Sequence, residues 1–272
     1  WARLGGLGMT ARQLADVDRA IGRGGGLVLV AGPAGSGRTT TLRALLHGLA
    51  DETRDMVAIG DAGAEGATPC RVDAASGFSL VDAITAAREQ GADVVMIDML
   101  ADRAEIVAAM DGALSGQMVL AGIDASTAVE AIQQLRGRRV EAGKLAAGLS
   151  LVIAQRLARR LCAECRTPEQ ARGSVSALLG FDPGTIVHAP AGCPACADTG
   201  FAGQTGVFEV IAVDASVRRL IDDGGDSTLL ARHVFLTAPN IASSARGLVR
   251  DGVLAPDDAV QLSRDVALSV IG

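Results

Sequence analysis

The chain has 272 residues, of which 49% are hydrophobic and 21% are charged, which is enough for one large domain or a medium-sized domain with an appendage. Its formal net charge of −6 disfavours a nucleic-acid binder that relies on a basic face. No apolar run approaches the roughly 20 residues that a membrane-spanning helix requires, so we expect a soluble segment.

The first predicted elements are a helix, a strand and a second helix. Residues 10–22 predict an amphipathic helix capped by Thr10. GLVLVA at 26–31 is typical of a buried parallel strand, and a helix is expected from about residue 39 to 49. The turn between them, GPAGSGRT, nearly satisfies the phosphate-loop pattern G-x-x-x-x-G-K-[ST], with Arg38 in the place of the lysine.

In such a loop the glycines let successive backbone N–H groups surround a phosphate at the positive end of the following helix. Thr39 would supply a hydroxyl to Mg²⁺. Arginine keeps the charge of lysine but is planar and longer, so nucleotide binding can survive while the geometry at the terminal phosphate suffers. The alternative is a glycine turn without nucleotide. The candidate phosphate-binding residues are Gly32, Pro33, Ala34, Gly35, Ser36, Gly37, Arg38, Thr39 and Thr40.

Strands and helices alternate in the next part of the chain. Further buried strands are predicted at residues 56–59, 94–97 and 119–123, and helices at residues 79–90, capped by Ser79, and 126–135. This alternation predicts an α/β fold with a doubly wound sheet. Asp98 follows one of these strands, where we expect an acid that positions Mg²⁺; the alternative is a helix cap at the end of the strand.

The last third of the chain is predicted to change character. Residues 151–161 fit a helical pattern, and residues 162–210 are expected to be rich in loops. A helical region is expected after Asp214, interrupted at residues 224–226 and at Pro239.

Four of the five cysteines form two C-x-x-C pairs that are separated by residues 166–192: Cys162, Cys165, Cys193 and Cys196. Two such pairs supply the four thiolates of a tetrahedral structural Zn²⁺ site; a redox pair and metal-free buried cysteines are the alternatives. The three histidines, His47, His188 and His233, lack the spacing of metal ligands. An aromatic content of 2% leaves almost nothing for stacking on bases, so no nucleic-acid partner is expected.

At four places the chain resembles the ATPases of type II secretion and type IV pilus assembly systems. The stretches are LGGLGMT at 4–10, GLVLVAGPAGSGRTTTL at 26–42, IAQRLARRLCAEC at 153–165 and GCPACADTGFAGQTGVFEV at 192–210. The resemblance covers nearly the whole chain. It implies a RecA-like P-loop NTPase core over residues 1–160, an inserted tetracysteine zinc subdomain over 161–212 and a C-terminal helical subdomain over 213–272.

The resemblance also implies ligands, partners and a location. The ligands would be ATP with Mg²⁺ and a structural Zn²⁺. The partners would be other subunits, in a homo- or hetero-oligomer that is a hexamer in the family, and the inner-membrane platform proteins of a secretion or pilus machine. The protein would be cytoplasmic and peripheral to the inner membrane. Because the chain opens at Trp1 without methionine, we expect it to be a piece of a longer protein.

Departures from the family pattern cluster at positions that the resemblance assigns to catalysis. The catalytic glutamate of the family falls on Met99 and a nearby arginine falls on Ala101. The acidic box keeps only Asp61, one family histidine falls on Asp124, and the histidine of a Thr-Gly-His motif falls on Gln117. The catalytic candidates that remain are Asp98, Asp61 and Gln117.

We therefore interpret the chain as a secretion or pilus ATPase with weakened or absent hydrolysis. Losing one oriented catalytic group typically costs about 10²–10⁴ in rate, and several are replaced here. One alternative is a fully active hexameric motor that uses Asp98 and Asp61. Another is a scaffold of the same fold that binds no nucleotide.

Overall fold

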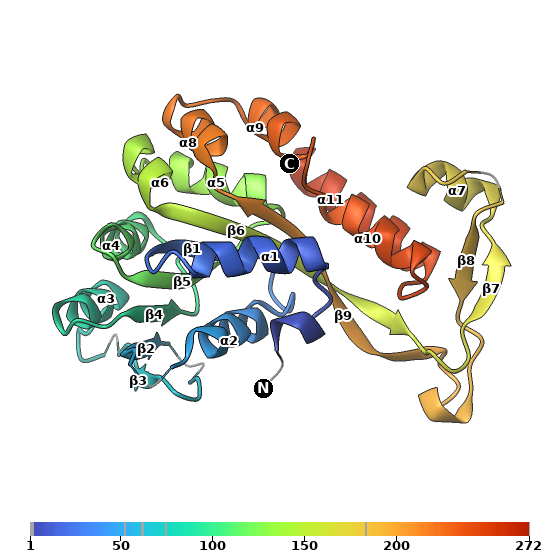
Figure 1. Cartoon of the computed structure of the whole chain (residues 1–272), viewed down its shortest axis with the longest axis horizontal. Helices are drawn as coiled ribbons and strands as arrows, with labels where there is room; N and C mark the ends of the chain where they lie inside the picture. Colours follow the sequence, from blue (N-terminus) through green and yellow to red (C-terminus); the bar gives the residue numbers. More distant parts are fainter. Residues whose placement is uncertain (1–2, 52, 61–62, 74, 183, 272) are drawn as a thin grey trace.

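A mixed sheet forms the centre of the molecule. The computed structural model describes residues 3–51, 53–60, 63–73, 75–182 and 184–271, and the side chains of those up to residue 265. Within these residues seven strands form the sheet, in the order β3-β2-β4-β5-β1-β6-β9 (Figure 1). Neighbours are parallel except β9, which runs antiparallel to β6. The strands are β1 Gly26–Ala31, β2 Met56–Ile59, β3 Thr68–Cys70, β4 Val94–Ile97, β5 Met118–Ile123, β6 Leu149–Leu161 and β9 Phe201–Ala212.

Strand β1 shows why the sequence of this sheet is apolar without alternation. All six of its residues are buried. Leu27 and Leu29 face one hydrophobic core, whereas Val28 and Val30 face a second core on the other side of the sheet. A parallel strand covered on both faces must be apolar throughout, as predicted for residues 26–31.

Helices cover both faces of the sheet (Figure 1). One face packs against α1 Ala11–Ile21 and α2 Arg38–Leu49. The other face packs against six helices of the described chain: α3 Leu80–Glu89, α4 Arg103–Leu114, α5 Ala128–Gly137, α6 Ala142–Gly148, α8 Ala215–Asp222 and α9 Ser227–Val234. This arrangement of helices on both sides of a mostly parallel sheet confirms the predicted α/β fold.

Three helices begin where the sequence predicts. Thr10 caps α1 by accepting a hydrogen bond from the Gln13 N–H, and the Gln13 side chain in turn accepts one from the Thr10 N–H. Ser79 and Asp82 form the same reciprocal pair at the start of α3. Thr127 caps α5. Each cap satisfies N–H groups that the first turn of a helix leaves without a backbone partner, so these residues mark helix starts in the sequence.

The predicted helix at residues 151–161 is wrong, because this segment is the strand β6. Ile153, Leu157 and Leu161 follow one another at intervals of four residues, which mimics one face of a helix. In the fold, residues 149–154 pair with β1, and residues 151–161 pair with β9 apart from an irregularity between Arg159 and Leu161. These long-range hydrogen bonds and the burial between two cores outweigh a local periodicity that a single sequence shows equally well.

Beyond the sheet, β6 and β9 continue together as an arm (Figure 1). The arm carries β7 Thr167–Gln170, α7 Gly173–Leu179, β8 Ile186–Ala189 and a short 3₁₀ turn, Pro194–Cys196. Helices α10 Ile241–Arg250 and α11 Pro256–Ile271 share a third core with it. The interruptions predicted near residues 224–226 and at Pro239 are confirmed, since they separate α8, α9 and α10. The division at residues 160 and 212 stays a prediction.

Arg159 connects the arm to α11. Its guanidinium lies over the ring of Phe201, 4.1 Å from the ring centre, and donates two hydrogen bonds of 2.6 and 3.2 Å to the Asp258 carboxylate. A planar, two-pronged donor suits both contacts at once. No helix within the described residues has the length and hydrophobicity needed to cross a bilayer.

Glu209 is a buried carboxylate that joins two helices to the sheet. It is 1% exposed and accepts hydrogen bonds from the backbone N–H of Ala128 at 2.8 Å and of Ile241 at 3.3 Å, the first residues of α5 and α10. Burial raises the pKa of Glu209 to about 7, against the lowering effect of these two N–H groups and of Arg156. The carboxylate therefore binds two helix N-termini at the cost of its own desolvation.

Replacing Glu209 by glutamine should change how stability depends on pH. The pKa of Glu209 is about 7 in the folded protein, against an ordinary value of 4.5. Between pH 4.5 and 7 this side chain is therefore protonated in the folded state but ionised in the unfolded state. Raising the pH through this window should lower the free energy of unfolding of the wild type by roughly 3 kcal/mol relative to Glu209→Gln, with no further relative change above pH 7. Urea unfolding of both proteins from pH 4.5 to 8 measures the difference. A constant difference across this range would contradict the prediction.

Candidate functional site

The predicted phosphate loop lies where β1 ends and α2 begins. Residues 32–37 connect Ala31, the last residue of β1, to Arg38, the first residue of α2. Gly35 and Gly37 adopt φ angles of +77° and +87°, a region that side chains disfavour. Gly37 occupies the N-cap position and brings no side chain to the N–H groups of the first helical turn, which are thus available to an anion.

The inner wall of the loop is tightly packed. A Cβ atom at Gly32 would overlap Ser36 Oγ and lie 2.9 Å from the backbone oxygen of Gln155. Ser36 is 4% exposed, and its Oγ has no hydrogen-bond partner among the described residues. A buried hydroxyl without a partner is costly unless a ligand or water completes it. The close approach at Gly32 and this hydroxyl both fit a loop that holds a phosphate.

Gln155 holds the loop from the side of β6. It is 1% exposed, and its Nε2 donates a 2.7 Å hydrogen bond to the Ser36 carbonyl oxygen. The sequence analysis placed Gln155 on the helix expected at residues 151–161. In the structure its side chain is buried on β6 and does not face solvent. Had the apolar run LSLVIA at 149–154 been taken as a buried strand, Gln155 would have fallen beside the end of β1.

Arg38 points towards Asp124 across the mouth of the loop. The Arg38 side chain is 14% exposed, whereas that of Asp124 is 72% exposed, and Nη1 of the arginine lies 3.8 Å from Oδ1 of the aspartate. Burial lowers the pKa of the Arg38 guanidinium and the charge of Asp124 raises it. An arginine remains protonated under such shifts, so the loop contains a fixed, poorly hydrated positive charge.

Asp98 stands at the same edge of the sheet as the loop. It follows β4, and β5 lies between β4 and β1. Gly60, at the end of β2, allows it to sit there: a Cβ at this glycine would come within 2.5 Å of Asp98 Oδ2. The alternative role as a helix cap belongs instead to Asp102, whose side chain accepts from the Glu105 N–H at the start of α4.

The structure does not bring Gln117 to the loop. This residue precedes β5 and is 7% exposed, and its Nε2 donates a 2.6 Å hydrogen bond to the Ala92 carbonyl oxygen. Because β5 runs parallel to β1, Gln117 lies at the opposite edge of the sheet, about 20 Å away at 3.3 Å per residue. The remaining catalytic candidate, Asp61, lies outside the described residues.

Next to the loop is a hollow of about 240 Å³. Its walls include Leu7, Thr40, Gln204 and Phe208, together with Gln155. A ligand whose phosphates occupy the loop therefore has space for a further group between the loop, the β6–β9 pair and the amino-terminal residues.

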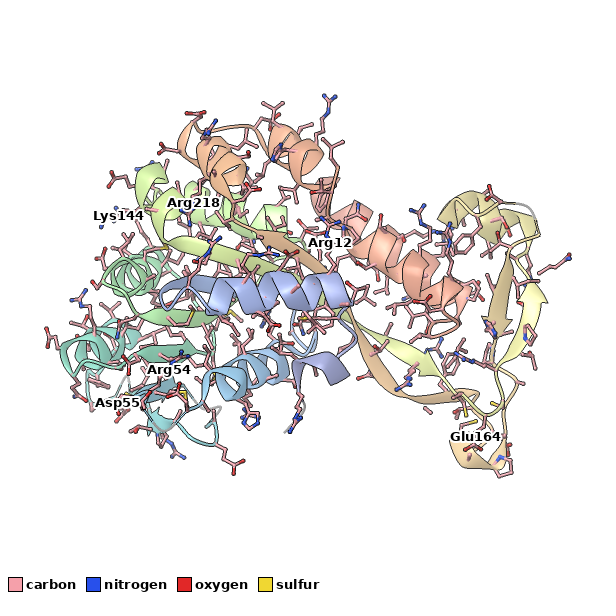
Figure 2. The ribbon with its side chains drawn as sticks, viewed as in Figure 1. Arg12, Arg54, Asp55, Lys144, Glu164 and Arg218 are labelled. Atoms are coloured by element: carbon pink, nitrogen blue, oxygen red, sulfur yellow. The ribbon has the colours of Figure 1, made fainter. Side chains whose placement is uncertain are left out.

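The four predicted metal ligands come together at the far end of the arm. Their sulfur atoms lie within 4.8 Å of one another, and no other group of three or more metal-binding side chains occurs among the described residues. Cys162–Cys193 sulfurs are 3.9 Å apart, and those of Cys165–Cys196 and Cys193–Cys196 are 3.8 Å apart. Figure 2 shows Glu164, which lies between two of these cysteines in sequence, at the tip of the arm. The arrangement can hold a metal ion.

The backbone around the cluster is arranged for thiolates. Cys162 directly follows β6, and its N–H donates to the Gly200 carbonyl oxygen just before β9. The N–H groups of Cys193 and Gly200 lie 3.3 and 3.2 Å from Cys196 Sγ. Burial raises the pKa of the Cys196 thiol, but these two N–H groups, together with hydrogen bonds from the Cys193 and Cys165 side chains, lower the pKa to about 6. Burial and the same sharing of protons among the cysteines raise the pKa of Cys165 to about 12 and also raise that of Cys193, so the thiolate is favoured at Cys196. Hydrogen bonds to the charged form favour the thiolate, which is the metal-binding species.

The chain is similar to known secretion proteins. Residues 2–261 match the type II/IV secretion system protein family. The chain is 33% identical over 264 residues to type II secretion system protein E of Pseudomonas aeruginosa, covering 95% of this chain and 53% of that protein. It is 30% identical over 265 residues to type II secretion system ATPase E of Vibrio cholerae, covering 95% and 52%. It thus spans about half the length of these relatives.

Two solved structures share the fold. The Legionella pneumophila ATPase DotB matches with a TM-score of 0.69 at 14% identity, over 97% of this chain and 66% of that chain. The pilus retraction motor PilT with bound ADP matches with a TM-score of 0.69 at 17% identity, over 96% and 66%. These likenesses confirm the predicted RecA-like fold.

Removing the amide of Gln155 should destabilise the loop. Gln155→Met keeps most of the side-chain volume but leaves the buried Ser36 carbonyl oxygen without its donor, so we expect a loss of about 1–3 kcal/mol in the free energy of unfolding. Urea unfolding measures it. The same replacement at Gln170, which is exposed on β7, serves as the control and should change stability by less than about 0.5 kcal/mol. Equal effects of the two replacements would show that Gln155 does not support the loop.

Proposed function

Since the chain belongs to the type II/IV secretion system protein family, we propose that it is the ATPase-family subunit of a type II secretion or type IV pilus assembly machine, and that it binds nucleotide but hydrolyses ATP slowly or not at all. The observation that carries this proposal is a contrast between the backbone of the loop and the side chains beside it, at the edge of the sheet where β1 and β4 end. The backbone cradle of the loop is preserved, whereas the side chain after Asp98 is Met99.

Nucleotide binding would depend mainly on the backbone of the loop. Gly32, Gly35 and Gly37 shape it, and Ser36 Oγ is a buried polar atom that a bound phosphate or water would complete. Thr39 and Asp98 would be the ligands that reach Mg²⁺, directly or through water. The bound nucleotide with its metal would supply the phosphoanhydride bond and the charge compensation; the chain itself supplies N–H donors and the fixed charge of Arg38.

Slow hydrolysis follows from the groups that are replaced. Attack on the terminal phosphate requires a water molecule oriented by an acceptor. Met99, the residue after Asp98, has no acceptor for a proton. Gln117 lies at the opposite edge of the sheet and would not contribute. Of the three catalytic candidates, Asp98 is therefore the one that the structure describes and that lies at the same edge of the sheet as the loop.

The cysteine cluster would bind Zn²⁺ as a structural ion. Four sulfur atoms around zinc at about 2.3 Å stand about 3.8 Å apart at the corners of a tetrahedron. The three sulfur–sulfur separations given above, 3.8–3.9 Å, agree with that figure. Four thiolates leave no open position for chemistry, so the ion would serve to hold the end of the arm together.

Assembly and location are also proposals. The chain would work in an oligomer, a hexamer by the family resemblance, at the cytoplasmic face of the inner membrane, in contact with platform proteins of the secretion or pilus machine. The relatives named as type II secretion proteins support an association with a secretion machine.

Steady-state phosphate release tests the proposed loss of hydrolysis. We expect turnover of the unmodified protein well below about 1 s⁻¹, the lower end of typical enzymes, and a rise of about 100-fold or more in the double variant Arg38→Lys, Met99→Glu. Replacing Asp98 by asparagine in that variant should abolish the gain. Turnover above about 1 s⁻¹ by the unmodified protein would instead support an active motor, and failure to bind ADP in calorimetry would support a scaffold.

Metal analysis tests the zinc site. The purified protein should contain one zinc per chain, and Cys162→Ser or Cys196→Ser should lose most of it and make residues 162–200 sensitive to proteolysis. Cys70→Ser is the matched control, because Cys70 lies at the end of β3, outside the cluster, and should keep the metal. Absence of zinc and of any other metal from the unmodified protein would contradict the proposal.

A further inference from the structure

Asp124 is an acidic side chain at the mouth of a loop that is otherwise suited to bind anions. We propose that Asp124 acts as an internal counter-ion for Arg38, and that a nucleotide phosphate must take Arg38 from it in order to bind. Asp124 would thus set the phosphate affinity of the loop. This inference rests on the proposed function, since it takes the loop to be a nucleotide-phosphate site.

The sheet places Asp124 beside the loop. Strands β1 and β5 are parallel neighbours in register, with Ala31 opposite Ile123. The next residues along these two strands are Gly32 and Asp124, and the Gly32 N–H donates to the Ile123 carbonyl oxygen at 3.3 Å. The position of the aspartate is therefore fixed by the same backbone pairing that fixes the start of the loop.

The two side chains are unequal in their surroundings. Arg38 is the first residue of α2, and its side chain is largely buried, with Nη1 lacking a hydrogen-bond partner among the described residues. Asp124 is mostly in solvent and lies 3.8 Å away, which is close enough for attraction but too long for a hydrogen bond. Asp124 thus attracts Arg38 without forming a hydrogen bond to it, and Arg38 Nη1 is still able to donate a hydrogen bond to another anion such as a phosphate.

The next acidic residue after Asp124 in the chain is already engaged. Glu130, on α5, accepts hydrogen bonds from the Ser126 N–H at 2.6 Å and from Gln134 Nε2 at 3.1 Å. Asp124 is the acidic residue whose ion pair with Arg38 the structure records.

The strength of the pair determines the size of the expected effect. An ion pair with one largely exposed partner is weak, so Asp124 would compete with a phosphate and not block it. Neutralising Asp124 should release Arg38 and tighten phosphate binding about three- to tenfold. The competition is electrostatic, so the advantage should shrink as salt screens the charges, for example between 50 and 500 mM.

Isothermal titration calorimetry with ADP, without Mg²⁺, tests the proposal on the wild-type protein, Asp124→Asn and Asp111→Asn. Asp111→Asn is the matched control: the same change of charge, on α4, in a side chain that bonds Lys144 (labelled in Figure 2) at 2.8 Å. Asp111 lies one residue before Gly112, and Gly112 packs against Gln117 at the edge of the sheet opposite the loop. We expect Asp124→Asn to lower the Kd for ADP about three- to tenfold at 50 mM salt and Asp111→Asn to leave it unchanged.

Two further results separate the outcomes. The thermal midpoint of the nucleotide-free Asp124→Asn protein should stay within about 2 °C of the wild type, because loss of a weak surface pair barely affects stability. Saturable ADP binding with equal Kd in all three proteins, or weaker binding by Asp124→Asn, would overturn the role of Asp124 and leave the nucleotide site standing. No binding by any of them would remove the nucleotide site and this inference together.

Discussion

The parallel pairing of β1 with β5 and β6 is the constraint on which the rest of the structure depends. It is possible because β1 is apolar on both faces and is covered by helices on both sides, so its backbone groups are satisfied by neighbouring strands and not by water. Parallel strands end at a common edge. The pairing therefore brings the start of the phosphate loop, Asp124 after β5 and Gln155 on β6 to one place, although they are far apart in the sequence.

At that edge the backbone of the loop indicates phosphate binding, whereas the side chains around it do not indicate efficient hydrolysis. The backbone of the loop keeps the glycine conformations and the close packing at Gly32 that a phosphate cradle requires. The charged side chains have a different arrangement, in which Arg38 faces Asp124. Because binding of phosphate relies on N–H donors and hydrolysis relies on oriented side chains, the two activities can be lost separately. This separation is the physical basis for proposing a subunit that binds nucleotide and turns it over slowly.

The arm and the C-terminal helices depend on β6 and β9, which extend the central sheet outward to the cysteine cluster. Contacts along this pair of strands connect distant parts. Glu209 binds the first residues of α5 and α10 beside the sheet, and Arg159 binds α11 further out. Strand β6 thus connects the loop, through the hydrogen bond between Gln155 and Ser36, with the arm.

The sequence by itself determined the features that depend on neighbouring residues: the phosphate-loop pattern, the helix caps at Thr10 and Ser79, the buried strands and the spacing of the cysteines. Each follows from local backbone geometry or from the short reach of a ligand set. Only the tertiary structure decided that residues 149–161 form a strand, that Gln155 supports the loop and that Gln117 lies at the opposite edge of the sheet. Such facts depend on which strands pair and in which direction, and hydrogen bonds between distant segments leave no periodicity in a single sequence by which to recognise them.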